Sequence, residues 1–288
     1  MSHITRRSAL ITASALPLAA RAAWSAAPKN IVLIGATAQS APEVIKQALE
    51  QGRKVTALAR RPDDVTGKGH ANLTIIKGDV RDQASIESAL TGKEVVISLI
   101  GPRVDPRVEV EFMDLYTVGT ANIAAAMKKK GNKKLLVTSS VGAEHVVTEK
   151  PKSTDLRDMW LWNARKLYAD MAAMEKMMPG LGLQYIILRP GFMIDRPQAN
   201  NLKIAVDDKS PKGAGPIITF ADFAAFILAQ VDSDQYNSKA VSLFSDEQSE
   251  WGKNLDFNAL LKKREATGPM ENVPVESAAK TAPAASPK

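Results

Sequence analysis

Two arginines that follow a small-residue turn and a buried strand are the residues of this sequence best suited to bind a charged ligand. The apolar run 31–34 leads into a turn over 35–40, and a helical pattern then continues to Gly52. A second apolar run, 55–59, ends in Arg60 and Arg61. Amide groups at the start of a helix bind phosphate, and a guanidinium group binds phosphate through two hydrogen bonds. The order strand, helix, strand therefore predicts the opening unit of a dinucleotide-binding fold, with a pyrophosphate at the helix N-terminus.

The residue type at the end of the second strand indicates which dinucleotide is bound. A carboxylate at this position hydrogen-bonds the adenosine ribose of NAD, whereas an arginine accommodates the 2′-phosphate of NADP. This sequence has Arg60 there. We therefore predict NADP as the cofactor.

The glycine pattern of the turn is only partly present. In the form G-x-x-G-x-x-G, Gly35 fills the first position, but Ala38 and Ala41 fill the second and third. One added methyl at each position weakens or re-aims phosphate binding more readily than it abolishes it. Ser40 has two interpretations, a capping box with Glu43 or a hydrogen bond to phosphate, and the sequence does not decide between them.

Composition excludes several classes of function. The chain has 288 residues, of which 45% are apolar, as expected for a globular protein of one large or two small domains. Its formal charge of +7 includes three arginines before residue 28, and the remaining +4 is too small and dispersed to predict nucleic-acid binding. No cysteine is present, and the three histidines lack ligand spacing, so we expect no metal. No apolar run reaches the ~18 residues of a membrane span.

The two ends of the chain differ in composition from the part between them. Residues 1–27 have Arg6-Arg7, then a mildly apolar stretch and small-residue cleavage candidates, and they resemble a bacterial twin-arginine leader. The alternative is a Sec-type leader that contains two arginines. Either predicts an exported, for example periplasmic, protein. We expect an NAD(P)-binding domain over 28–250, then a C-terminal helix and a disordered Ala/Pro/Ser/Lys tail over 251–288.

Strand and helix patterns alternate along the middle of the chain. They predict an α/β fold, a doubly wound parallel sheet of the Rossmann type in a single domain with small substrate-side insertions near its C-terminal end. We expect strands at 31–34, 55–59, 73–76, 94–100, 135–140, 183–189 and 240–244. Helices are expected from the turn to residue 51 and at 82–90, 109–130 and 157–178, with another opening at Thr219, and an irregular region at 190–216.

With these elements placed, the chain resembles the atypical short-chain dehydrogenases, in particular the NmrA-like group and flavin reductase (biliverdin-IXβ reductase). The resemblance covers 30–244 and rests on the order and spacing of seven short segments. They are Ile34-Gly35-Ala36-Thr37, Ala59-Arg60-Arg61, Gly78-Asp79-Val80, Ile100-Gly101-Pro102-Arg103, Val118-Gly119-Thr120-Ala121-Asn122, Thr138-Ser139-Ser140 and Leu188-Arg189-Pro190-Gly191.

The resemblance implies a role for each candidate residue. The pyrophosphate turn would comprise Gly35, Thr37, Ala38, Gln39 and Ser40, and Arg60 would meet the 2′-phosphate. Asp79 and Val80 would flank the adenine, Leu99, Gly101 and Arg103 would lie near the middle of the cofactor, and Thr138, Ser140, Pro190 and Gly191 would line the nicotinamide pocket. Asp79 could instead be a turn residue after a strand, and Arg103 a solvent-exposed loop residue.

The sequence departs from the family in its catalytic residues. Typical short-chain dehydrogenases use a Tyr-x-x-x-Lys pair, in which the ammonium lowers the pKa of the phenol. Here Ala172 follows Tyr168 at the lysine position. Ser140 remains as the candidate proton-relay or substrate-orienting group, and its alternative is a strand-end serine that bonds backbone.

Two functions remain open at this point. The resemblance implies an NADPH-dependent oxidoreductase that transfers hydride to a planar conjugated acceptor, such as a flavin or quinone. The alternative is a non-catalytic NADP-binding redox sensor or partner-binding protein. The Trp and Met residues of 157–178 are either core or the roof of an aromatic pocket with Phe192 and Met193.

Overall fold

The computed structural model describes residues 29–92, 94–102, 108–144, 147–152, 156–207 and 217–245. The predicted leader, Arg103 and the predicted C-terminal helix and tail lie outside these residues. Every statement below concerns the described part of the chain.

An eight-stranded sheet, in the order β3-β2-β1-β4-β5-β6-β10-β8, forms the centre of the structure. Its strands are β1 (Ile31–Ile34), β2 (Val55–Ala59), β3 (Leu73–Lys77), β4 (Val95–Ser98), β5 (Lys134–Thr138), β6 (Gln184–Pro190), β8 (Leu202–Val206) and β10 (Lys239–Ser245). Neighbouring strands are parallel except for the edge strand β8, which pairs antiparallel with β10. The strand order reverses between β1 and β4, where doubly wound sheets bind their ligands. The predicted fold class is confirmed.

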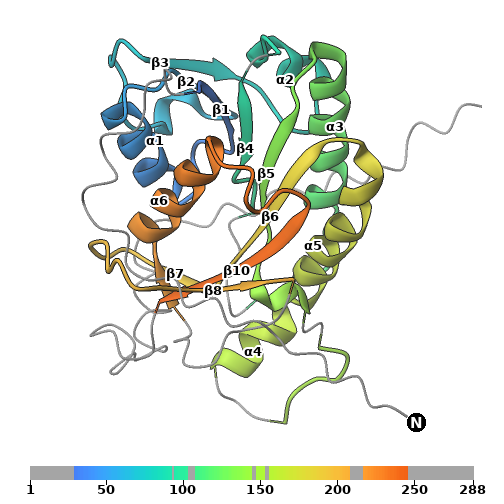
Figure 1. The fold of residues 1–288 in the computed structure, drawn as a ribbon. Helices are drawn as coiled ribbons and strands as arrows, with labels where there is room; N and C mark the ends of the chain where they lie inside the picture. The colour runs from blue at the N-terminus through green and yellow to red at the C-terminus, as the bar shows by residue number, and fades with distance from the viewer. Residues whose placement is uncertain are drawn as a thin grey trace, which may run out of the picture.

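Helices cover both faces of the sheet (Figure 1). They are α1 (Ala41–Glu50), α2 (Gln83–Ala89), α3 (Leu115–Lys130), α4 (Leu156–Asn163), α5 (Arg165–Met177) and α6 (Phe220–Val231). Figure 1 shows α1 and α6 on one face, α2, α3 and α5 on the other, and α4 beyond the carboxyl end of β5.

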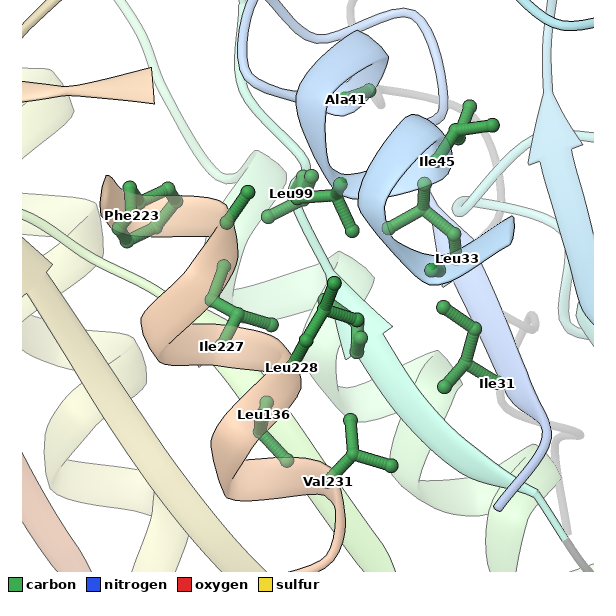
Figure 2. Close-up of a cluster of buried hydrophobic side chains, with 14 of the residues drawn as sticks. Ile31, Leu33, Ala41, Ile45, Leu99, Leu136, Phe223, Ile227, Leu228 and Val231 are labelled. Atoms are coloured by element: carbon green, nitrogen blue, oxygen red, sulfur yellow. The ribbon is translucent and has the colours of Figure 1, made fainter. Parts of the chain in front are cut away.

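Alternate residues of each central strand enter two separate cores. Ile31 and Leu33 of β1 pack with α1 and α6, as Figure 2 shows, whereas Val32 and Ile34 pack with α2, α3 and α5. All four side chains are almost fully buried. A strand buried on both faces reads as a continuous apolar run, which is why the sequence identified β1 and β4 directly.

The long helix predicted from Glu109 begins six residues later, and the helix predicted over 157–178 is two helices that divide at Ala164. One hydrogen bond explains both differences. The N–H of Val110 donates to the carbonyl of Asn163 at 2.9 Å, which holds the segment before α3 in a non-helical path and occupies the carbonyl at the end of α4. Asp170 of α5 then caps α3, accepting from the N–H groups of Tyr116 and Thr117 at 2.7 and 3.2 Å.

The region 190–216, predicted to be irregular, contains strands in its described part. β8 lies there, as does β7 (Phe192–Ile194), which pairs with β9 (Ile217–Thr219) in a two-stranded parallel sheet. The helix predicted to open at Thr219 is α6. The Thr219 hydroxyl caps it by accepting a hydrogen bond of 2.9 Å from the N–H of Asp222. Among the described helices, none has the length and apolarity that crossing a membrane requires.

Candidate cofactor and active site

Gly35 opens the turn between β1 and α1, and only glycine fits there. Its φ is +84°, and an added Cβ would lie 2.8 Å from the carbonyl carbon and oxygen of Leu99. β1 and β4 therefore approach closely at the point where the sheet order reverses. Leu99 itself is buried, and its N–H donates to the carbonyl of Ile34 at 2.8 Å.

The turn after Gly35 leaves amide donors free at the N-terminus of α1. The N–H of Ala38 bonds the carbonyl of Gly35 at 2.9 Å, and the N–H of Ala41 bonds the carbonyl of Ala38 at 3.0 Å. No acceptor in the described part of the chain takes the N–H groups of Thr37, Gln39 and Ser40. Three free donors at a helix N-terminus form a site for an anion such as a diphosphate.

We call the N–H groups of Thr37, Gln39 and Ser40 the amide cradle. The two alanines that replace glycines do not fill it. Ala41 is fully buried in the core between α1 and α6, and Ala38 packs against the same core. Their methyl groups thus fill core space at positions where glycine would allow a closer approach of helix and strand. The residues present fit a dinucleotide diphosphate.

The predicted capping box of Ser40 and Glu43 is not formed. The Ser40 side chain makes no cap hydrogen bond to α1. The Glu43 carboxylate lies along the helix instead, 3.6 Å from the Lys46 ammonium and 3.3 Å from Nε2 of Gln47. This arrangement leaves the Ser40 hydroxyl, although largely buried, for the alternative role of bonding a phosphate.

Arg60 lies exposed at the carboxyl end of β2. Within the described residues it has no ion pair and no side-chain hydrogen bond. Its neighbour Arg61 differs, because Nε of Arg61 bonds Oδ2 of Asp64 at 2.7 Å. An unpaired guanidinium at this strand end is available for the 2′-phosphate of NADP.

The loop after β3 is fixed by its own backbone and by α3. Oδ1 of Asp79 accepts a hydrogen bond of 2.9 Å from the N–H of Arg81. This oxygen therefore has the role expected of a turn residue after a strand. The Val80 side chain is buried against Gly119, and Nδ2 of Asn122 donates to the carbonyls of Val80 and Arg81, each at 3.1 Å. Asn122 thus holds the predicted adenine loop, a role that no local pattern indicated.

The remaining predicted residues lie at or next to the carboxyl ends of β4, β5 and β6. Gly101 is exposed, Pro190 is buried in β6, and Oγ1 of Thr138 is a buried atom without a partner in the described ranges. Oγ of Ser140 accepts from the N–H of Gly142 at 3.1 Å, as the backbone-bonding alternative expected. The Ser140 hydroxyl still has its hydrogen to donate.

The phenols near this edge are sequestered. Oη of Tyr168 accepts from Nε1 of Trp160 at 2.8 Å, and Tyr168 is largely buried. Burial, together with the nearby Tyr168 and Asp170, raises the pKa of Tyr116 far above its usual range. Neither phenol is arranged as an acid or base. The methionines of α5 that are buried, Met171 and Met174, belong to the core rather than to a pocket.

An ionic cluster at the same edge was not predicted. Arg189, at the end of β6, contacts Glu175 of α5 and Glu144 of the 3-10 helix η3 (Val141–Glu144). Burial lowers the pKa of Arg189, but the hydrogen bond and charge of Glu175 and the charge of Glu144 outweigh it and raise the pKa. The sequence showed Arg189 within a motif, but its partners are 14 and 45 residues away along the chain.

No group of three or more His, Asp or Glu side chains within the described ranges could hold a metal ion. The geometry above is that of a nucleotide site at a sheet edge.

Comparison with known proteins identifies the family. A family model described as NAD(P)H-binding matches residues 35–234, which is more than half of the chain. The chain belongs to this NAD(P)H-binding family. The match confirms the predicted nicotinamide dinucleotide cofactor and begins at Gly35, the first residue of the cradle.

Individual relatives are distant. An uncharacterized chloroplastic protein of Arabidopsis thaliana is 26% identical over 218 residues, which cover 71% of this chain and 74% of the relative. Two other curated relatives match over about a third of their own length.

Solved structures share the fold. An anaerobillin reductase from Escherichia coli O157:H7 has a TM-score of 0.59 at 19% identity, covering 77% of this chain and 99% of its own. A short-chain dehydrogenase/reductase from Veillonella parvula, solved in complex with NADP, has a TM-score of 0.56 at 14% identity, covering 75% of this chain and 94% of its own.

Proposed function

We propose that this NAD(P)H-binding protein is an NADPH-dependent oxidoreductase that transfers hydride to a planar conjugated acceptor, such as a flavin or a quinone. One observation carries the proposal. The N–H groups of residues 37, 39 and 40 have no acceptor among the described residues, the methyls of Ala38 and Ala41 pack with the core, and Arg60 is exposed without an ion pair at the end of β2. NADPH, when bound, supplies the hydride. The NADP-bound fold neighbour from Veillonella parvula supports the choice of cofactor.

The residues of the site suit an acceptor that needs little acid–base assistance. Thr138 has a buried hydroxyl free to orient the nicotinamide half of the cofactor, and Ser140 can donate its hydroxyl hydrogen to an acceptor. The described site has no Tyr–Lys pair, since Ala172 stands at the lysine position. Holding two reactants in the right geometry supplies much of the rate of such a transfer. The fold neighbour that is an anaerobillin reductase supports a conjugated acceptor.

A second candidate function is a non-catalytic NADP-binding redox sensor or partner-binding protein. It is favoured by the Ser140 hydroxyl, which already bonds the backbone of η3, and by the sequestered Tyr168. Both functions need the same cradle. They differ in whether bound NADPH is consumed.

Turnover of NADPH distinguishes the two functions. Protein mixed with NADPH and either FMN or a soluble benzoquinone should oxidise NADPH with saturable kinetics, followed by absorbance at 340 nm. Ser140→Ala should lower kcat about 2- to 10-fold, since it removes one hydrogen bond to the acceptor, worth about 0.5–1.5 kcal/mol. NADPH that binds but is not oxidised with either acceptor would favour the sensor.

We further propose that the protein is exported in a folded state with its cofactor. The twin-arginine-like leader over 1–27 supports this, because that route carries folded proteins and NADP is made in the cytoplasm. Arg6→Lys with Arg7→Lys should keep the protein in the cytoplasm of a bacterial host, as measured by fractionation and immunoblotting. Undiminished export of the double variant would indicate the Sec-type alternative.

A further inference from the structure

The ionic cluster of Arg189, Glu175 and Glu144 joins three elements at the carboxyl edge of the sheet. Nε of Arg189 bonds the two carboxylate oxygens of Glu175 at 3.0 and 3.2 Å, and Nη2 bonds Glu175 again. Nη1 bonds Glu144. Oγ of Ser139 donates to the same Glu175 at 2.5 Å. One guanidinium therefore ties β6 to α5 and to η3 at the same time.

The cluster is more than a surface ion pair. The side chains of Arg189, Glu144 and Glu175 are only 14%, 13% and 10% exposed, so all three groups lose most of their hydration. Buried charges of this kind add little to stability compared with well-packed apolar residues. What they do provide is a fixed geometry, because the guanidinium fork binds carboxylates in one orientation.

The end of the cluster at Glu144 sets the position of Ser140. η3 begins directly after Ser140, and the backbone N–H of Ala143 donates to the carbonyl of Ser140 at 3.0 Å. η3 also packs against Tyr168, since a Cβ on Gly142 would come within 2.5 Å of the Tyr168 ring. The chain before η3 is held to β6 by the N–H of Ser139, which donates to the carbonyl of Leu188 at 2.7 Å. Glu144 adds a second attachment to β6 at the far end of η3.

We infer that Arg189 is a positioning residue, which through Glu144 fixes η3 and thereby holds the Ser140 hydroxyl at the acceptor side of the site. The inference rests on the proposed oxidoreductase function for its catalytic consequence. Glu175 holds the guanidinium in place and Glu144 receives its second arm. The cluster contacts neither the N–H groups at the start of α1 nor Arg60, so we expect it to affect the reaction with the acceptor more than NADPH affinity.

Glu144→Gln tests this role, because glutamine keeps the shape of the side chain and removes its charge. We expect NADPH affinity, measured by calorimetry, to stay within twofold of the parent. The kcat/KM for FMN or benzoquinone should fall by about 2- to 10-fold, no more than in Ser140→Ala, because the loss acts through one hydrogen bond of the Ser140 hydroxyl. Arg189→Lys, whose ammonium lacks the fork, should show the same split. Equal loss of NADPH affinity, or an unchanged kcat/KM in an active protein, would overturn the inference.

Asp232→Asn is the matched control. Asp232 pairs at 2.5 Å with the fully buried Arg53, so this variant also breaks a buried ion pair, but at the end of α6 and not next to Ser140. It should lower the melting temperature and leave kcat/KM within twofold of the parent. A comparable loss of kcat/KM in this control would mean that Glu144 has only a structural role.

Hydrogen exchange gives a readout that does not depend on turnover. In Glu144→Gln, the amides of Gly142 and Ala143 should exchange at least tenfold faster than in the parent, while those of α1 are unchanged. Unchanged exchange at both amides would refute the proposed positioning role of the ionic cluster, whatever the activity. If the parent does not oxidise NADPH, the proposed function fails, and the exchange result still decides the role of Arg189.

Discussion

Gly35 and Ala41 occupy the first and third positions of one glycine motif, yet the structure places different demands on them. Gly35 has a left-handed backbone and no room for a side chain beside Leu99. Ala41 is the first residue of α1, and its buried methyl fills the core. The departures from the motif therefore occur where a methyl is tolerated, and the glycine remains where a methyl is not.

This difference predicts opposite outcomes for two single-methyl changes. Gly35→Ala should cost about 1–3 kcal/mol of unfolding free energy and weaken NADPH binding, because the strained turn must move. Ala41→Gly should cost about 0.8 kcal/mol, the order for one buried methyl or methylene group, and leave NADPH affinity within twofold. Urea unfolding and calorimetric titration measure both quantities. An Ala41→Gly protein that binds NADPH at least tenfold more tightly would show that the methyl obstructs the phosphates.

At the residue scale the sequence identified candidate groups but not their partners. The position of Arg60 after a strand was enough to predict its place at the end of β2, and its role at the 2′-phosphate stays a prediction. Ser40, Asp79 and Ser140 each had two interpretations, since the choice depends on which neighbour the side chain meets. The ionic cluster at Arg189 could not be predicted, because its two carboxylates, Glu144 and Glu175, lie on two other elements.

At the element scale, local patterns located most helices and strands and failed where a distant partner decides. The parallel strands are apolar runs buried on both faces, and such runs are visible in the sequence. The start of α3 and the break between α4 and α5 follow from the bond between Val110 and Asn163. β7 and β9 are three residues each and pair only with each other, so neither has a pattern of its own.

Glu94, just before β4, connects the α2–β4 turn to the end of α3. Its carboxylate accepts from the N–H of Thr91 at 3.1 Å and from Nδ2 of Asn132 at 3.2 Å. Burial raises the pKa of Glu94, but the hydrogen bonds of Thr91 and Asn132 outweigh it and hold the pKa below its usual range. A pKa lowered on folding stabilises the protein above the unfolded pKa, and this contribution is lost as the pH falls through the folded pKa.

We therefore expect Glu94→Gln to be less stable than the parent by about 1.5–3 kcal/mol at pH 7, the range for hydrogen bonds to a charged group. The difference should shrink below the unfolded pKa of about 4.3. Urea unfolding at pH 7 and near pH 3.5 measures it, with the exposed Glu50→Gln as the control. A difference that is the same at both pH values would contradict the assigned role of the Glu94 charge.

At the scale of the whole molecule, the alternation of elements was sufficient to predict the doubly wound sheet, whereas the place of its ligand stays a prediction. The strand order of the sheet changes direction between β1 and β4, next to Gly35, and the family match covers the same region. The fold therefore predicts where a dinucleotide lies, and single residues such as Arg60 predict which dinucleotide it is. The residues proposed to meet the acceptor lie near η3, whose arrangement depends on long-range contacts.

The central claim is that the open cradle and Arg60 together bind NADPH in preference to NADH. Calorimetric titration of the parent, Arg60→Ala and the control Lys54→Ala with both dinucleotides tests it directly. Lys54 is a suitable control because it is also exposed, but directly precedes the N-terminal end of β2. We expect Arg60→Ala to lose about 1.5–3 kcal/mol of NADPH binding, the range for hydrogen bonds to charged groups, or roughly 10- to 160-fold in Kd. NADH affinity, and both affinities of Lys54→Ala, should change less than twofold. A parent protein that binds neither dinucleotide at micromolar concentration, or an Arg60→Ala protein that keeps its full NADPH affinity, would contradict the claim.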